Sequence, residues 1–399
     1  MTQHQRVRLA DVSTLITKGT TPKTLGSAYS NQGIPFLRSE DVVGSSVNWQ
    51  ATKYFIDQTT HELLRRSILR GGDVLVTIAG TIGRVGYVPL GAPEMNCNQA
   101  VALIRLKSDL IDYRYAKYAL QSPLIADRLF QQRTTATIPN ISLAQLGDAE
   151  IPLPPLDEQQ RIVDVLDRAA SIQRLRQAAD EKLKQIIPAL FVDMFGGTAQ
   201  IKDRWPQMRL DEVADIGSGI TKGRQIDPAE AIDVPYLRVA NVQDGYLDMD
   251  EIKTITIRRT EQAKYALQNG DIVMTEGGDL DKLGRGYVWA NELPYCAHQN
   301  HVFKVRPRQQ LVSPYFLATY VGSPAGKDYF LRVAKRTTGI ASINKTQLSA
   351  LPVPMPPIEL QQAFEQKLSD LRSIQRLGNK ATAAALQAAN AASAAFFAA

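Results

Sequence analysis

The sequence predicts an α/β protein: a tandem repeat of two mixed α/β domains, each followed by a long helix, with the two helices pairing as an antiparallel coiled coil. Three observations predict this fold class: segments that recur about 200 residues apart, short β-prone runs between Gly and Pro turns, and two long helical patterns. The domains are expected at residues 1–155 and 201–357, with a central helical spacer at 156–200 and a C-terminal helical spacer at 358–399.

The internal repeat covers nearly the whole chain and keeps its order. The offset between equivalent residues is 202 near the C-terminal end of each copy and changes slightly upstream, as short loop insertions would cause. The two copies are therefore expected to share a core and to differ in their loops. The matched segments are 34–38 with 234–238, 72–75 with 270–273, 86–88 with 286–288, 138–146 with 340–348, 151–160 with 353–362, and 171–175 with 373–377.

The first part of each copy has the pattern of a mixed α/β domain. In the first copy, residues 73–78 and 100–106 are apolar, β-branched runs typical of strands, and Gly71-Gly72 marks a turn. Residues 111–129 carry an apolar stripe and predict a helix.

The second part of each copy predicts a long helix. Pro154-Pro155 ends the first domain, and Asp157 is the expected N-cap, with Gln160 completing a capping box. No Gly or Pro then occurs before Pro188. The second helix becomes rich in Ala after Arg376, so we expect it to stay helical but to be less well supported near its end.

Apolar residues in both helices fall at steps of three and four. This spacing favours a narrow seam against another long helix, and the alternative is an amphipathic helix that lies on its own domain. A helix over residues 158–187 would be about 45 Å long. The predicted seam residues are Ile162, Leu166, Ala169, Ile172 and Leu175 in the first helix, and Phe364, Leu368, Leu371, Ile374 and Leu377 in the second.

Composition excludes several classes of protein. Hydrophobic residues make up 44% and charged residues 22%, as in a soluble globular protein. No apolar run is long enough for a transmembrane helix, and residues 1–8 lack the apolar core of a signal peptide. Two cysteines, Cys97 and Cys296, are too few for a secreted disulfide scaffold, so we expect a cytoplasmic protein. The net charge of +6 over 399 residues is a mild indication of nucleic-acid binding.

The order of the repeated motifs resembles the specificity (S) subunit of type I restriction-modification systems. The motifs are IPFLR at 34–38, GDVL at 72–75, IPNI at 138–141 and IPLPP at 151–155, followed by EQQ at 158–160, each with a second-copy counterpart. The resemblance implies two target-recognition domains, each of which reads one half of a split, asymmetric DNA site. It implies that the helical spacers dock two adenine methyltransferase (M) subunits, which motor-nuclease (R) subunits join.

The resemblance implies no catalytic residue and no cofactor in this chain, with S-adenosylmethionine, Mg²⁺ and ATP expected on the partner subunits. The sequence contains neither an Asn/Asp-Pro-Pro-aromatic methyltransferase motif nor a phosphate-binding loop. Glu251 and Lys253 near Asp248 are the nearest pattern to a nuclease site, and His298 and His301 near Cys296 lack a fourth metal ligand, so no metal is predicted. Two alternatives remain: a methyltransferase or nuclease with atypical motifs, and a structural adaptor that does not bind DNA.

Polar and cationic stretches in both copies are the candidates for DNA contact, because Arg, Lys, Asn, Gln, Ser and Thr read base edges and phosphates. Of these, the stretches 133–135 and 335–337 are the strongest candidates, because they align at the 202 offset. The predicted DNA-binding residues are Lys18, Thr20, Thr21, Lys23, Arg38, Ser39, Arg84, Asn98, Gln99, Arg133, Thr134 and Thr135 in the first copy, and Lys222, Arg224, Arg238, Asn241, Lys282, Arg285, Gln299, Asn300, Lys335, Arg336 and Thr337 in the second.

Overall fold

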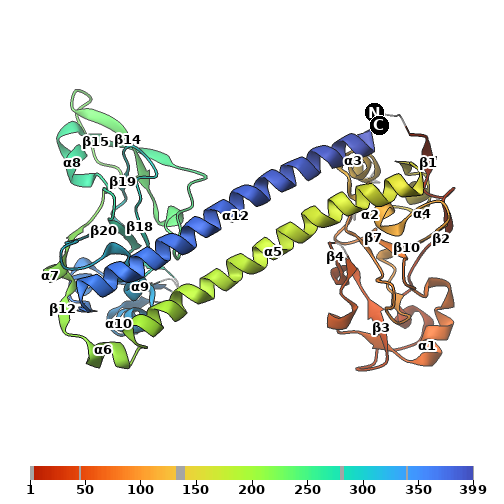
Figure 1. The fold of residues 1–399 in the computed structure, drawn as a ribbon, viewed down its shortest axis with the longest axis horizontal. Helices are drawn as coiled ribbons and strands as arrows, with labels where there is room; N and C mark the ends of the chain where they lie inside the picture. Colours follow the sequence, from red (N-terminus) through yellow and green to blue (C-terminus); the bar gives the residue numbers. More distant parts are fainter. Residues whose placement is uncertain (1–3, 45, 132–139, 279–282, 338–339, 399) are drawn as a thin grey trace. The chain divides into compact units, whose positions relative to one another are not determined.

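The computed structural model divides the chain into two units (Figure 1). Unit 1 comprises Met1–Gln177 and Asn379–Ala399, and unit 2 comprises Ala178–Gly378. Each unit holds one α/β domain, the first half of the long helix that follows it, and the second half of the other long helix. The tandem α/β organisation predicted from the repeat is confirmed. The structure describes residues 4–44, 46–131, 140–278, 283–337 and 340–398.

Unit 1 is built around a four-stranded antiparallel sheet in the order β2-β10-β7-β8 and a three-stranded sheet, β6-β3-β9. The strands predicted over 73–78 and 100–106 are confirmed as β7 and β10. Two helices, α2 and α3, replace the single helix predicted over 111–129, because Pro123 has no N–H to continue the hydrogen bonding of α2. The strands are β1 Arg6–Arg8, β2 Ser13–Lys18, β3 Ile34–Leu37, β4 Val42–Val43, β5 Ser46–Val47, β6 Phe55–Ile56, β7 Val74–Thr77, β8 Val85–Tyr87, β9 Asn96–Cys97, β10 Val101–Leu106 and β11 Glu150–Pro152; the helices are α1 Gln58–Leu63, α2 Tyr113–Gln121, α3 Pro123–Gln131, α4 Leu143–Gly147 and α5 Leu156–Phe195.

Unit 2 repeats these sheets as β13-β20-β16-β18 and β15-β14-β19, and adds a three-stranded sheet, β17-β22-β21. In each unit a short strand pair, β1 with β11 or β12 with β23, ties the start of the domain to the segment before its long helix. The strands are β12 Gln207–Arg209, β13 Ala214–Gly217, β14 Ala231–Leu237, β15 Lys253–Arg258, β16 Ile272–Thr275, β17 Gly277–Gly278, β18 Gly286–Val288, β19 Ala297–His298, β20 Val302–Pro307, β21 Lys335–Thr337, β22 Ile340–Ser342 and β23 Pro352–Pro354; the helices are α6 Gln200–Arg204, α7 Leu210–Val213, α8 Gln262–Tyr265, α9 Pro314–Gly322, α10 Pro324–Val333, α11 Lys345–Ser349 and α12 Ile358–Ala398.

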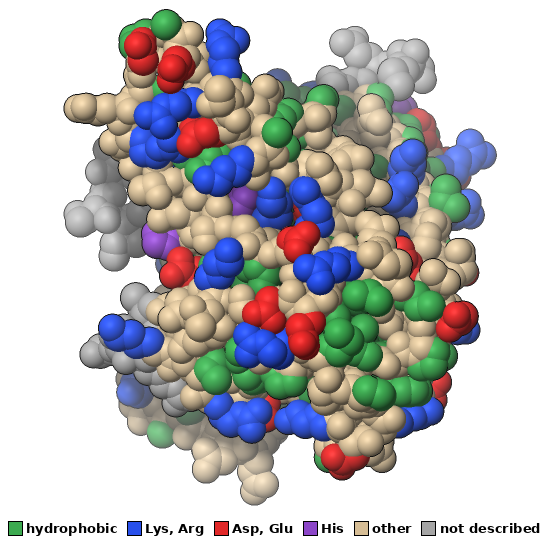
Figure 2. Space-filling view, turned by 90° about the vertical axis from the view of Figure 1, so that its left-hand side faces the viewer, with side chains coloured by type: hydrophobic (Ala, Val, Ile, Leu, Met, Phe, Trp, Pro, Cys, Tyr) green, Lys and Arg blue, Asp and Glu red, His purple; other side chains and the backbone are tan. Residues whose placement is uncertain are grey.

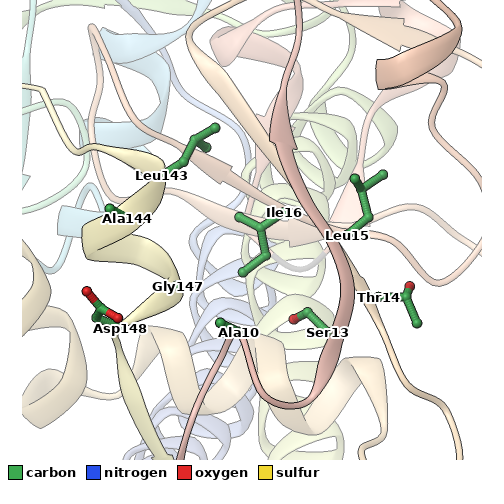
Figure 3. Close-up of a pocket in the computed structure, with 9 residues that line it drawn as sticks. All are labelled: Ala10, Ser13, Thr14, Leu15, Ile16, Leu143, Ala144, Gly147 and Asp148. Atoms are coloured by element: carbon green, nitrogen blue, oxygen red, sulfur yellow. The ribbon is translucent and has the colours of Figure 1, made fainter.

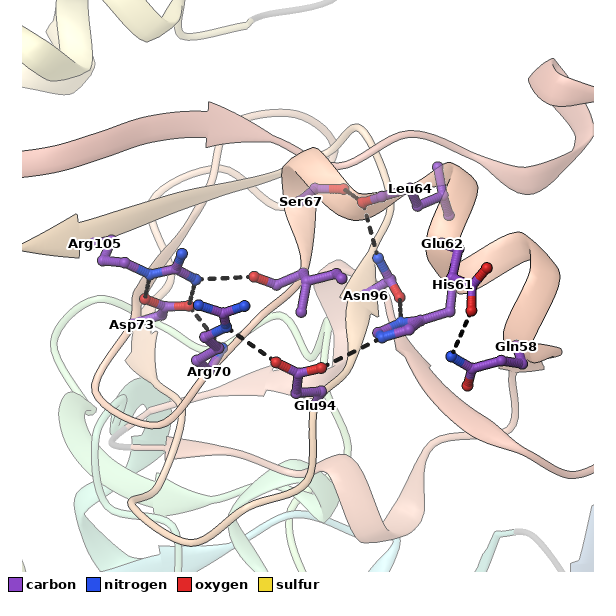
Figure 4. A network of polar contacts seen from close by, with 11 residues as sticks. Gln58, His61, Glu62, Leu64, Ser67, Arg70, Asp73, Glu94, Asn96 and Arg105 are labelled. Carbon is purple, nitrogen blue, oxygen red and sulfur yellow. Dashed lines mark hydrogen bonds and ion pairs between the residues drawn. The ribbon is translucent and has the colours of Figure 1, made fainter.

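The conserved spacing of the two copies reflects buried polar contacts that occur in both. Arg105 donates two hydrogen bonds of 2.8 Å to the buried carboxylate of Asp73, and Arg306 makes the same pair of bonds to Asp271 at 2.6 and 2.7 Å. In unit 1, Figure 4 shows that ion pairs and hydrogen bonds continue from this pair to Glu94 and the buried His61. These charged groups are satisfied by one another, which is the arrangement of a structural network rather than of a reactive site.

The first Gln of the repeated Gln-Gln pair, at 159–160 and 361–362, has a structural role in both units. The amide of Gln159 is fully buried, accepts a hydrogen bond from the Asp112 N–H at 2.8 Å and donates to the Pro154 carbonyl at 2.8 Å. Gln361 accepts from the Ser313 N–H at 2.9 Å and donates to the Pro356 carbonyl at 2.8 Å. Each amide therefore ties the start of a long helix to the loop before α2 or α9 and satisfies buried backbone groups.

The long helices form as predicted, but their starts differ from the predicted capping box. α5 has 40 residues and α12 has 41, and Pro188 lies inside α5. Because α5 begins at Leu156, Asp157 lies in its first turn, and Gln160 bonds Arg114 and Asp164 rather than capping the helix. Among the residues that the structure describes, no helix is long and apolar enough to cross a membrane.

The predicted helix seam is only partly buried. Ile162, Leu166 and Ala169 pack into the core of unit 1, and Phe364 and Leu368 pack into the core of unit 2. Further along each long helix, the apolar stripe no longer lies beside a domain. The predicted seam is therefore wrong at the next positions, which are not buried. Leu371 is half-buried, and the exposed fractions are 40% for Ile172, 69% for Leu175, 66% for Ile374 and 68% for Leu377.

The ends of the long helices are anchored by aromatic residues. In unit 2 the ring of Phe364 lies 5.6 Å from that of Phe191 and 5.4 Å from that of Phe195, so the start of α12 contacts the end of α5 in the predicted antiparallel sense. In unit 1 the fully buried Phe397 lies 5.6 Å from the ring of Tyr115. The expectation of a poorly supported end of α12 is therefore wrong, because Phe397 follows Phe195 by the same 202 residues and fills an equivalent role.

Candidate nucleic-acid interface

In unit 1, three of the predicted DNA-binding stretches meet at the ends of two neighbouring strands. β3 and β9 pair in parallel, with Leu37 opposite Cys97, and the Asn98 N–H donates to the Leu37 carbonyl at 3.0 Å. Arg38 and Asn98 therefore leave the sheet side by side. A Cβ on Gly19 would lie 1.9 Å from the Cys97 carbonyl oxygen, so only Gly lets the stretch after β2 cross these strand ends.

Unit 2 repeats this junction. β14 and β19 pair in parallel, with Leu237 opposite His298, and the Gln299 N–H donates to the Leu237 carbonyl at 2.9 Å. A Cβ on Gly219 would lie 2.2 Å from the His298 carbonyl oxygen. The same backbone frame therefore carries Arg38 and Asn98 in one copy and Arg238 and Gln299 in the other.

The Gly-rich loops adjoin these junctions. In unit 1, an ideal Cβ on Gly80 would lie 4.0 Å from the Ser39 hydroxyl. In unit 2, Gly277–Gly278 form strand β17, which pairs with β22, and β22 pairs with β21 at Lys335–Thr337. In unit 1 the structure thus brings stretches from four separate parts of the copy together, and in unit 2 it links the Gly-rich loop to Lys335–Thr337 through β22.

The predicted residues differ in how accessible they are. Arg133, Thr134, Thr135 and Lys282 lie outside the described residues, as do the side chains of Arg336 and Thr337. The exposed candidates are Lys18, Lys23, Arg84, Gln99, Lys222 and Lys335, and the half-buried ones are Thr20, Thr21, Arg38, Ser39, Asn98, Arg224, Arg238, Arg285, Gln299 and Asn300.

Asn241 is a wrong prediction. It is 2% exposed, and its amide oxygen accepts the Arg238 N–H at 2.9 Å, while its amide nitrogen donates to the carbonyls of Asp248 and Glu251. Its amide caps the turn after β14 and has no surface left for a base. Arg224 is also engaged, since it donates to both carboxylate oxygens of Glu261 at 2.7 and 2.8 Å.

Charge is spread rather than gathered on the face that Figure 2 shows. Lys and Arg side chains occur over most of this face, with Asp and Glu side chains between them and hydrophobic side chains grouped toward its lower half. Such a surface agrees with the mild net charge of the chain.

Neither the cavity beside β2 nor the Glu251 pattern brings together the groups of a catalytic site. A cavity of about 460 Å³ lies between β2 and α4 (Figure 3), and Asp148 is the ionisable residue in its lining. No group of three His, Cys, Asp or Glu in the described part of the chain could hold a metal ion. Glu251 and Lys253, which suggested a nuclease pattern, form an ion pair of 3.3 Å, and Glu251 also binds Arg238.

Both cysteines are buried, but they do not occupy equivalent positions in the two copies. Burial raises the pKa of the Cys97 and Cys296 thiols to about 12, so both stay protonated at neutral pH. The strand register makes His298, not Cys296, the equivalent of Cys97. Each side chain contacts the carbonyl of the residue four positions on, Val101 or Val302.

Comparisons with known proteins agree with this architecture. The family model described as type I restriction modification DNA specificity domain matches residues 1–185 and 202–386. A putative type I restriction enzyme specificity subunit from Methanocaldococcus jannaschii is 27% identical over 177 residues, 44% of this chain and 41% of the relative. The EcoKI specificity subunit of Escherichia coli K12 is 24% identical over 277 residues, 66% of this chain and 59% of the relative. The chain therefore spans about half the length of these two relatives.

Solved structures show the same fold. A chain from a study of complex assembly and conformational transition in a type I R-M system superposes with a TM-score of 0.60 and 19% identity, covering 100% of this chain and 98% of the other. The S subunit of a type I restriction-modification system from M. genitalium gives a TM-score of 0.58 and 15% identity, with 98% and 96% covered.

Proposed function

Since the chain belongs to the type I restriction-modification DNA specificity family, we propose that it is the DNA-binding specificity subunit of such a restriction-modification complex. The observation that carries the proposal is the duplicated junction, in which one backbone frame presents polar side chains from separate stretches in each unit. Base edges are read by such side chains, and the frame holds them in fixed positions.

Each unit would read its own half of a split site. The two frames have the same backbone pairing but carry different side chains, such as Ser39 and Asn98 in unit 1 against Val239 and Gln299 in unit 2. Different donors and acceptors select different bases, so the two half-sites should differ in sequence. This makes the proposed site asymmetric, unlike the palindrome that a symmetric dimer would read.

The long helices would dock two adenine methyltransferase subunits. The segment SIQRL occurs at 171–175 and again at 373–377, and its apolar residues are exposed in both places. Exposed Leu175 and Leu377 side chains are suited to an apolar partner surface, and identical segments are suited to two copies of one partner. In this proposal S-adenosylmethionine, Mg²⁺ and ATP belong to the methyltransferase and motor-nuclease subunits, and this chain has no catalytic role.

The test of recognition is sequencing of methylated bases in DNA from cells that express the chain with its neighbouring methyltransferase. We expect methylated adenine in both halves of one split, asymmetric motif. A methyltransferase that is active with this chain but marks no split motif would overturn the proposal and favour a structural adaptor. Methyl transfer by the purified chain without a partner would instead favour an atypical enzyme.

The test of docking is co-purification of the methyltransferase with a Leu175→Asp, Leu377→Asp variant. Both side chains are more than two-thirds exposed, so the substitutions should abolish assembly while leaving thermal unfolding unchanged. Leu90→Asp is the matched control, because Leu90 is 70% exposed but lies in a domain loop. Wild-type assembly by the double variant would exclude docking on these segments.

A further inference from the structure

We propose that Arg38 reads a guanine in the half-site of unit 1, and that Arg238, at the equivalent position, instead anchors a loop of its own unit. The inference rests on the proposed function, since it requires unit 1 to bind DNA. It goes beyond that function, because it assigns a base contact to Arg38 and assigns none to the equivalent Arg238.

The two arginines share one backbone position. Arg38 follows Leu37 at the end of β3, and its N–H donates to the Asp41 carboxylate at 2.8 Å. Arg238 follows Leu237 at the end of β14, and its N–H donates to the Asn241 amide oxygen at 2.9 Å. Their backbone angles are also similar, with φ of −119° and −102° and ψ of 176° and 167°. Any difference in role must therefore come from what holds the side chains.

Arg38 is held by an aromatic side chain. Its Nη1 donates to the Tyr54 hydroxyl at 2.6 Å, and its guanidinium carbon lies 4.7 Å from the centre of the Tyr54 ring. The nearest carboxylate, that of Glu40, is 3.5 Å from its Nε, and the side chain is 37% exposed. A guanidinium over a ring keeps its charge and has its plane fixed, while most of its five N–H donors stay available. A fixed arginine fork is the usual partner of the O6 and N7 acceptors of guanine.

Arg238 is held by an acid and by backbone. Its Nη2 donates to the Glu251 carboxylate at 2.8 Å and to the Glu251 carbonyl at 3.0 Å, and its side chain is 18% exposed. Its Nε is buried and has no partner among the described residues. Hydrogen bonds from Arg238 and Lys253 hold the pKa of Glu251 below its usual value, so the acid stays charged and the pair stays formed. The fork of Arg238 is therefore occupied inside its own unit.

Two positions in the neighbouring strand segment determine this difference. Tyr54 lies beside Phe36, whose N–H donates to the Tyr54 carbonyl at 2.9 Å, and Lys253 lies opposite Tyr236 in the same register. Two residues earlier, Thr52 in unit 1 corresponds to Glu251 in unit 2. At these two positions the first copy supplies a ring and no acid, and the second supplies an acid and no ring; among the described residues, the carboxylate that pairs with the Arg38 side chain is that of Glu40, in the turn after β3.

The surroundings of Arg38 are those of a reading position. Asn98 leaves the adjoining strand end, the Gly80 loop approaches Ser39, and Lys18 and Lys23 are exposed on the stretch that crosses the junction. A guanine contact at Arg38 would therefore lie near the Asn98 amide and two exposed cations, with Glu40 as the neighbouring acid. Amides and cations are the groups that read further bases and hold phosphates.

The experiment is selection of binding sites from a randomised duplex DNA library by the full-length chain, compared with its Arg38→Lys and Arg238→Lys variants. Lysine keeps the charge but loses the planar fork. We expect Arg38→Lys to lower the preference for guanine at one position of one half-site by about tenfold, with the other half-site unchanged. Arg238→Lys should leave both half-sites unchanged.

A second variant, Tyr54→Leu, tests the ring without changing Arg38 and should weaken the same guanine preference. If the wild-type chain selects a split site and Arg38→Lys leaves it unchanged, or if Arg238→Lys alters a half-site, the inference is overturned while the proposed function stands. If the wild-type chain selects no sequence, the proposed function itself fails. Each variant should unfold at the same temperature as the wild-type chain, so that a lost base preference is attributed to a lost contact with DNA and not to unfolding.

Discussion

Acid should unfold unit 2 before unit 1, because a buried imidazole in unit 2 stands where unit 1 has a thiol. His298 is fully buried in β19, and its Nδ1 lies 2.6 Å from the Val302 carbonyl oxygen, whereas Cys97 occupies the equivalent place in β9. Burial lowers the pKa of His298 from its ordinary value of 6.5 to about 4. The Cys97 thiol, with its pKa raised to about 12, stays neutral in both states across this range.

The sign and size of the effect follow from these values. Between pH 6.5 and 4 the unfolded chain binds a proton at this imidazole and the folded chain does not, so the free energy of unfolding falls as the pH falls through that window. A difference of about 2.5 between the two pKa values corresponds to about 3 kcal/mol at the lower end of the window. This is a large fraction of the stability of a single domain.

Hydrogen exchange followed by mass spectrometry from pH 7 to pH 4 would measure the two units in one molecule. After correction for intrinsic exchange rates, amides of β14, β19 and β20 should lose protection on acidification earlier than those of β3, β9 and β10. His298→Cys should remove most of the difference, and His301→Cys controls for the loss of a more exposed histidine nearby. Equal loss of protection in both units of the wild-type chain, or an unchanged difference in His298→Cys, would refute the reasoning.

Three further predictions concern stability. Phe397→Ala should destabilise unit 1 by about 3–5 kcal/mol, as expected for a fully buried aromatic ring, and hydrogen exchange should localise the loss to unit 1, whereas loss in unit 2 would contradict it. Gln361→Leu should lower the unfolding free energy of unit 2 by about 2–3 kcal/mol in chemical denaturation, because it leaves the Ser313 N–H and the Pro356 carbonyl unpaired. Gln362 is exposed, so the control variant Gln362→Leu should leave the unfolding free energy almost unchanged. Lys117→Met should stabilise the protein at pH 7 by about 1–3 kcal/mol in thermal unfolding, because Lys117 is buried and its pKa is lowered to about 8. Between pH 8 and 10.5 the folded state binds fewer protons than the unfolded state, so the gain in stability should shrink as the pH rises through this window. A gain that does not depend on pH would show that the removed charge is not its cause.

The repeat made the architecture predictable, while the role of single residues depended on contacts that the sequence does not display. Residues 73–78 and 100–106 were identified as strands because their apolar pattern is local. The partial burial of the helix seam could not be predicted, since Leu175 and Ile162 have the same periodicity and differ only in whether a domain lies beside them. Phe397 was detectable, because it repeats Phe195 at the 202 offset, but its core lies on a segment far away in sequence.

The predicted DNA-binding residues also depended on contacts that the sequence does not display. Asn241 and Asn98 are both amides after a strand, and composition cannot distinguish them. Both ends of the Asn241 amide form hydrogen bonds with the turn that it caps. The described contacts of the Asn98 side chain are limited to a local hydrogen bond from the Ala100 N–H. The effect of Tyr54 and Glu251 on the neighbouring arginines could not be predicted, because it appears only once the strand register is known.

The junction also explains how the two copies can differ in reading without differing in fold. The frame is held by groups that no base would contact: glycine at the crossing, strand pairing at Leu37 and Leu237, and a cap that Asp41 or Asn241 supplies equally well. Side chains at the reading positions contribute little to that frame, so their replacement would change base preference at little cost in stability. The pairs Thr52 with Tyr54 and Glu251 with Lys253 go one step further, since they alter what an unchanged arginine is free to contact. Exchange of these pairs between the copies, with both arginines left in place, should move the guanine preference from one half-site to the other. A preference that stayed with unit 1 after the exchange would show that the surrounding loops, and not the partner of the arginine, decide which copy reads that base.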